Sequence, residues 1–73
     1  MTAWYIKDST YGTNEPHIVD EETIYQAEHG MNYLNADEFT FLCEANCLDD
    51  AKEHYWEVFS RMANDYMAEY LHP

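Results

Sequence analysis

The chain has 73 residues, and 15 aspartates and glutamates outnumber three lysines and arginines, which gives a net charge of −12. This balance excludes proteins that bind nucleic acid or anionic membranes through basic patches, because such proteins must neutralise phosphates. Disorder is also excluded, because the chain is 47% hydrophobic and has seven tyrosines, three phenylalanines and two tryptophans to build a core. We expect residues 1–73 to form a single acidic domain. No signal peptide or membrane span is visible, so we expect a cytoplasmic location with reduced cysteines.

The chain begins with a segment that is typical of a β-strand. Residues Thr2 to Lys7 are rich in β-formers and alternate in polarity, with Trp4 and Ile6 on one side. Residues 9–16 follow with glycine, asparagine and proline, which predicts a turn.

The segment at about residues 20–29 has two interpretations. In the first, Asp20 caps a short helix that has two glutamates in its first turn and Gly30 just past its end. In the second, residues 17–19 and 23–28 pair as strands, because both contain β-branched or aromatic residues. The capping signals favour the helix.

A connection over residues 31–37 leads to a second segment of strand character. Residues 38–45 place Phe39, Phe41 and Cys43 in alternation with Thr, Leu and Glu, which predicts a strand. A helical interpretation of this segment is also open.

The segment from Cys47 to about Leu71 predicts one long amphipathic helix, because its apolar residues recur with helical periodicity and no Gly or Pro interrupts it. Its apolar face comprises Leu48, Ala51, Tyr55, Val58, Phe59, Met62, Ala63, Tyr66 and Tyr70. Its opposite face comprises Asp50, Glu53, Glu57, Ser60, Arg61 and Asn64. We therefore predict an α+β domain in which two or three short strands pack against this C-terminal helix, with a short helix at about 20–29.

Few residues have the spacing of a catalytic or metal site. Cys43 and Cys47 are four residues apart and His54 follows, whereas zinc sites use four ligands at tighter, paired spacings. A fourth ligand would have to come from His17 or His29, and no nucleophile motif surrounds either cysteine. A metal-binding protein or thiol enzyme is the weakest hypothesis. We predict no catalytic residues, no metal and no cofactor, and we expect Cys43 to be a small buried residue.

Acidic residues gather in three clusters: Asp20-Glu21-Glu22, Asp37-Glu38, and Asp49-Asp50 with Glu53 and Glu57. One interpretation is a solvated surface that aids solubility. A sharper one is a surface that imitates nucleic acid, because carboxylates four residues apart on a helix lie about 5–6 Å apart and resemble neighbouring phosphates. The predicted partner-binding residues are Asp50, Glu53 and Glu57, with Asp20, Glu21 and Glu22 as a second patch.

In size, charge and layout the chain resembles phage-encoded inhibitors of host machinery, in particular anti-CRISPR proteins and DNA-mimic anti-restriction proteins. The segment Glu44-Ala45-Asn46-Cys47-Leu48-Asp49-Asp50-Ala51 is also similar to the strand-to-helix step of small RNA-polymerase inhibitors that phages encode. The resemblance implies a viral protein for evasion of host defence, and it transfers no individual site residue.

The leading hypothesis is an inhibitory binding protein without enzymatic activity. Its acidic surface would block a positively charged nucleic-acid-binding site on a host complex, such as a CRISPR effector, a restriction enzyme or a polymerase. The second hypothesis is an interaction or assembly module in which Tyr66, Met67 and Tyr70 pack on a partner helix, on host RNA polymerase or on a second copy in a homodimer. Salt-insensitive binding that is lost in Tyr70→Ala would favour the second.

Overall fold

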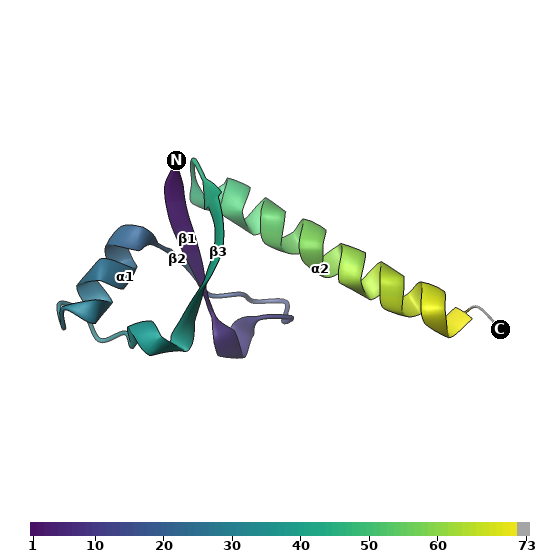
Figure 1. Ribbon diagram of the computed structural model, residues 1–73, viewed down its shortest axis with the longest axis horizontal. Helices are drawn as coiled ribbons and strands as arrows, with labels where there is room; N and C mark the ends of the chain where they lie inside the picture. The colour runs from purple at the N-terminus through teal and green to yellow at the C-terminus, as the bar shows by residue number, and fades with distance from the viewer. Residues whose placement is uncertain (72–73) are drawn as a thin grey trace.

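The first predicted strand forms the centre of a three-stranded antiparallel sheet in this computed structural model. The structure describes the backbone of residues 1–71 and the side chains of residues 1–59. In chain order the elements are β1 (Thr2–Lys7), the 3-10 turn η1 (Asp8–Thr10), β2 (Ile18–Asp20), α1 (Glu21–Glu28), the 3-10 turn η2 (Ala36–Glu38), β3 (Phe39–Ala45) and α2 (Leu48–Leu71). The strand order in the sheet is β2-β1-β3. Figure 1 shows α1 on one side of the sheet and α2 on the other. The predicted α+β class is confirmed.

The β3 strand contains a β-bulge that changes which side chains share a face. Trp4 of β1 lies opposite Cys43, but the next residue, Tyr5, lies opposite Phe41, so Leu42 is an extra residue in β3. The predicted strand is confirmed, but its simple alternation is wrong at the bulge. Cys43 lies on the same face of the sheet as Trp4, whereas Phe41 lies beside Tyr5. The rings of Phe41 and Tyr5 pack edge to face with their centres 5.8 Å apart, and Phe41 is 54% exposed.

The core lies between the sheet and α2. It is a cluster of buried side chains from all three strands and the helix: Trp4, Ile6, Ile18, Cys43, Ala45, Ala51 and Tyr55. Trp4 satisfies its indole N–H by donating to the carbonyl oxygen of Ala45 at 3.1 Å. Burial raises the pKa of the Cys43 thiol, so this side chain is the neutral, small core residue that the sequence predicted.

The predicted apolar face of α2 meets this core along the part of the helix whose side chains are described. Ala51 and Tyr55 are buried, Leu48 packs against the cluster, and Val58 and Phe59 are half-buried. The remaining predicted members of this face lie outside the described side chains: Met62, Ala63, Tyr66 and Tyr70.

Tyr55 also joins α2 to the loop between β1 and β2. Its hydroxyl donates to the carbonyl oxygen of Thr13 at 2.7 Å and accepts from the N–H of Gly12 at 2.9 Å. Gly12 has a φ of +84°, a left-handed conformation that glycine adopts without strain. Within the loop, the hydroxyl of Thr10 accepts from the N–H of His17 at 2.9 Å. The predicted turn over residues 9–16 is therefore a structured loop, tied to the helix by one buried side chain.

The capping prediction for α1 is confirmed. The Asp20 carboxylate accepts hydrogen bonds from the N–H of Thr23 at 2.9 Å and from its hydroxyl at 2.7 Å. At the other end, His29 is the C-cap and Gly30 has a φ of +68°. The competing interpretation placed a strand at residues 17–19, and a strand does form at Ile18–Asp20, but it pairs with β1 and not with residues 23–28. The competing interpretation is wrong for residues 23–28, because the cap starts the helix at Glu21.

The cap makes stability depend on pH in a defined way. The hydrogen bonds from the Thr23 side chain and backbone lower the pKa of Asp20 from its ordinary value of 3.8. The carboxylate therefore contributes stability that is fully present above about pH 3.8 and is lost as the pH falls through the lowered pKa. We expect Asp20→Ala to lower the free energy of unfolding by about 1 kcal/mol at neutral pH.

The variant Asp20→Asn isolates the pH-dependent part of the stability that Asp20 contributes, because asparagine still caps the helix but carries no charge. We expect the wild type to lose its advantage over Asp20→Asn when urea unfolding is measured at acid rather than neutral pH. Glu22→Gln, in the same first turn and exposed, is the matched control. A difference between wild type and Asp20→Asn that stays constant from neutral to acid pH would contradict the assignment.

Candidate functional site

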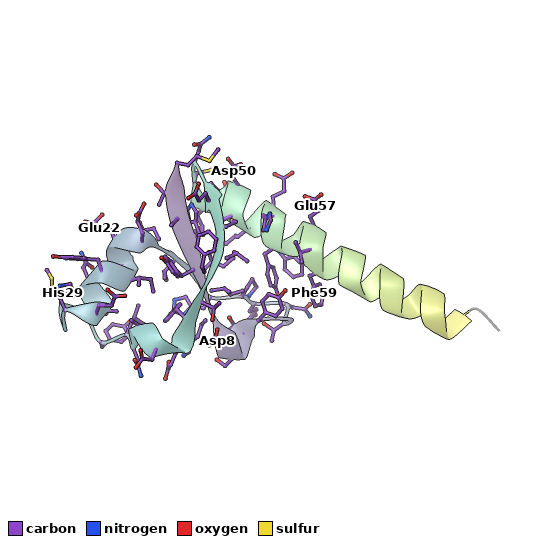
Figure 2. The ribbon with its side chains drawn as sticks, in the orientation of Figure 1. Asp8, Glu22, His29, Asp50, Glu57 and Phe59 are labelled. Atoms are coloured by element: carbon purple, nitrogen blue, oxygen red, sulfur yellow. The ribbon has the colours of Figure 1, made fainter. Side chains whose placement is uncertain are left out.

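Three predicted partner-binding residues lie together on the outer side of α2. Asp50, Glu53 and Glu57 are all exposed, and their spacing of three and four residues places them on one face of the helix. Figure 2 shows Asp50 and Glu57 projecting from the same edge of α2, with Phe59 on the opposite side. We call these three residues the α2 acidic face. These carboxylates face solvent because the opposite side of the helix, at Ala51 and Tyr55, packs into the core.

The second predicted patch lies at the start of α1, across the sheet from α2 (Figure 2). Two of its three members have structural partners: Asp20 caps the helix, and Glu21 accepts a hydrogen bond from the N–H of Ala3 at 3.3 Å. Glu22 is exposed in the first turn of the helix. The structure thus gives Asp20 the capping role that the sequence predicted, and it gives Glu21 a role in the fold that the sequence did not indicate.

The surface charge is negative even if every base is paired. The three lysines and arginines could each neutralise one of the 15 acids, which leaves twelve carboxylates without a cation from the chain. One such pair is formed by Lys7 and Glu38, whose charged atoms are 3.6 Å apart. The described carboxylates are exposed except for half-buried Asp20. A negative potential over the surface follows, and it attracts basic partners.

A groove that the sequence did not reveal lies between α2 and the sheet. It has a volume of about 530 Å³ and is lined by Ile6, Asp8, Tyr11, Thr40, Phe41, Leu42, His54, Tyr55 and Val58. We call it the aromatic groove. Tyr11 is 48% exposed and Phe41 is 54% exposed, and the Asp8 carboxylate accepts a hydrogen bond from the Thr40 hydroxyl. These residues come from β1, the loop that follows it, the bulged strand β3 and α2, so no local sequence pattern could have grouped them.

Among the residues whose side chains are described, the cysteines and histidines do not form a metal site. Cys43 is buried and Cys47 is exposed, and both are free thiols. Within the described side chains, no group of three or more His, Cys, Asp or Glu residues is placed to hold a metal ion. His54 instead lines the aromatic groove, and His29 stacks on Tyr25 with ring centres 4.1 Å apart.

The predicted contact stripe of Tyr66, Met67 and Tyr70 lies outside the residues whose side chains are described. Across the described part of the chain, no helix is both long and apolar enough to cross a membrane. In comparisons with known proteins, no family model, curated protein or solved structure matches the chain.

Proposed function

We propose that this protein is an inhibitory binding protein of the phage type that acts in the cytoplasm by occupying a basic, nucleic-acid-binding surface of a host complex. A CRISPR effector, a restriction enzyme and a polymerase are the candidate classes of target. The observation that carries the proposal is the exposure of the α2 acidic face on a domain whose net charge is −12.

The acidic charge supports a binding function because it has a physical cost. Like charges on a small domain repel one another and reduce stability, and a 73-residue chain has a modest core to offset that loss. A net charge of smaller magnitude is sufficient for solubility. A binding function would account for the excess charge, because an acidic surface attracts a basic partner and speeds its association.

The geometry of α2 supports nucleic-acid mimicry in particular. Glu53 and Glu57 are one helical turn apart and exposed, so their carboxylates repeat about every 5–6 Å along a straight element. Duplex DNA presents a comparable line of charges to the lysines and arginines of its binders. The protein would compete with DNA for the partner's DNA-binding surface, although it has no phosphodiester bond to cleave and no bases to recognise.

Salt and nucleic acid should both displace the partner. With the protein immobilised, we expect a basic nucleic-acid-binding complex from a host lysate to be retained at about 0.05 M salt and released at about 0.5 M, because added salt shortens the range of exposed charges. Duplex DNA added at low salt should release the same complex, since the two ligands would share one surface. Retention that changes with neither salt nor DNA would contradict the proposal.

A further inference from the structure

We propose that the outer edge of β3 binds an extended, basic segment of the partner protein, which joins the sheet as a fourth strand. This inference rests on the proposed function, because that function supplies a partner rich in lysine and arginine. It goes further by assigning the contact surface and the conformation of the bound segment. The α2 acidic face provides general attraction, whereas the edge of β3 provides an ordered contact.

Strand β3 is the longer of the two edge strands of the sheet. In the part of the chain that the structure describes, its only strand neighbour is β1. It has seven residues, whereas the other edge strand, β2, has three. Figure 1 shows β3 between α1 and α2. An edge strand presents N–H and C=O groups that have no ladder partner and can pair with another strand, so β3 is the better template for such pairing.

The hydrogen bonds of β1 show which of its residues direct their backbone groups toward β3. The N–H of Lys7 donates to the carbonyl oxygen of His17 at 2.9 Å, so Lys7 directs its backbone groups toward the β2 side of the sheet. These directions alternate along an antiparallel strand. Trp4 and Ile6 therefore direct their backbone groups toward β3.

The same alternation identifies the free backbone groups of β3. The partners of Trp4 and Ile6 in β3 are Cys43 and Thr40, so these two residues direct their backbone groups toward β1. Phe41 follows Thr40 and Glu44 follows Cys43. Phe41 and Glu44 therefore direct their N–H and C=O groups away from the sheet, where an added strand would pair with them.

The side chains of these two residues suit a basic neighbour. Phe41 and Glu44 lie opposite Tyr5 and Ala3, which flank Trp4 in β1, so both side chains lie on the face of the sheet turned away from α2. Phe41 is 54% exposed, and Glu44 is also exposed. A lysine or arginine on an added strand can pack its methylene stem on the phenylalanine ring and pair its charge with the carboxylate.

On the α2 side, the added strand would border the aromatic groove. Thr40 and Leu42 of β3 and Val58 of α2 are among its lining residues, and Leu42 also packs against the core cluster. Successive side chains of a strand point to opposite faces. One set would therefore meet the groove, and the other would meet Phe41 and Glu44. A segment in which apolar and basic residues alternate fits both faces.

The charge of the chain selects a basic partner over a second copy. Pairing of two β3 edges would bring together two domains that each carry a net charge of −12. Exposed carboxylates also lie along the edge itself, at Glu44 and at Asp37 and Glu38 just before the strand. Like charges on adjacent strands are destabilising, whereas opposite charges stabilise the pair. The same carboxylates therefore oppose self-pairing and attract a basic segment.

A peptide titration of the full chain tests the inference. The first probe is an acetylated, amidated seven-residue peptide in which lysine and valine alternate, beginning with lysine. The second probe has the same sequence with N-methyl groups on two adjacent central residues. Adjacent residues point to opposite edges, so either edge of the second probe lacks a donor, although its side chains and charge are unchanged. We expect the first probe to bind about tenfold more tightly, which corresponds to the loss of one or two hydrogen bonds.

The position of the bound peptide is measured by NMR. We expect the first probe to shift the amide signals of Phe41 and Glu44 and to slow the exchange of these amide hydrogens with solvent, because both become hydrogen-bonded. Equal binding of the two probes, no saturable shift at millimolar peptide, or shifts confined to the α2 acidic face would overturn the inference. A dimer of the chain that protects the same two amides without peptide would also overturn it, because a second copy would then occupy the edge.

Two charge-matched variants separate the edge of β3 from net charge. Glu44→Lys reverses a charge at the edge, and Glu28→Lys reverses an exposed charge at the end of α1. We expect Glu44→Lys to weaken binding of the lysine–valine peptide about tenfold and Glu28→Lys to leave it nearly unchanged. Equal losses in both variants would overturn the inference, because net charge alone would then explain binding. Circular dichroism of each variant checks that the fold is retained.

The outcomes for the edge of β3 and for the proposed function are distinguishable. Salt-dependent capture of a host complex with equal affinity by wild type and Glu44→Lys would overturn the role of the edge and leave the proposed function standing. Selective binding of the unmethylated peptide at Phe41 and Glu44, without salt-dependent capture of a basic complex, would overturn the proposed function and support the edge as a site for a basic strand.

Discussion

Tyr55→Ala is expected to lower the free energy of unfolding by about 3–5 kcal/mol, the range typical of removing a large buried aromatic side chain. The total stability of a chain this size is only about 4–11 kcal/mol, so the variant should be close to unfolding at physiological temperature. Tyr55 is 1% exposed and is the largest fully buried side chain among those described. It also contacts the rings of Tyr11, Trp56 and Phe59.

The two roles of Tyr55 can be measured separately by urea unfolding. Tyr55→Phe keeps the ring but removes the hydrogen bonds to Gly12 and Thr13, and we expect it to cost about 1 kcal/mol. Tyr33→Ala is the matched control, because that tyrosine is 97% exposed and its loss should change stability by no more than about 0.5 kcal/mol. A Tyr55→Ala variant as stable as the Tyr33→Ala control would show that α2 does not depend on this anchor.

Reversing charge on the α2 acidic face is expected to have the largest effect on binding. In Glu53→Lys/Glu57→Lys, attraction to a basic surface becomes repulsion at two neighbouring positions. We expect the affinity for the captured complex to fall about 30-fold or more, which corresponds to ~2 kcal/mol. The fold should be retained, because both positions are exposed and a lower net charge reduces self-repulsion.

The control must change net charge by the same amount at other places. Glu15→Lys/Glu28→Lys reverses two exposed carboxylates, one in the loop between β1 and β2 and one at the end of α1. Each reversal adds two charges, so both double variants change the net charge from −12 to −8. Surface plasmon resonance against the purified complex should show a large loss for the α2 variant and a small one for the control. Equal losses would mean that binding depends on total charge and not on this face.

Several structural features that depend on local signals could be predicted from the sequence. Asp20 caps α1 because a carboxylate can reach N–H groups three residues ahead, which is a property of the segment alone. The strands at Thr2–Lys7 and Phe39–Ala45 followed from short β-forming runs bounded by turns and acids. The burial of Ala51 and Tyr55, and the exposure of Asp50, Glu53 and Glu57, followed from helical periodicity in the same way.

The features that depend on the tertiary structure involve residues that are far apart in the chain. The bulge at Leu42 depends on how β3 aligns with β1, and it moved Phe41 away from the face of Cys43. Tyr55 binds a loop about 40 residues earlier, and Asp8 binds Thr40, which are pairings that no local pattern encodes. The charge of this protein could therefore be read from its sequence. The aromatic groove could not, because it forms only when the loop, the bulged strand and the helix pack together.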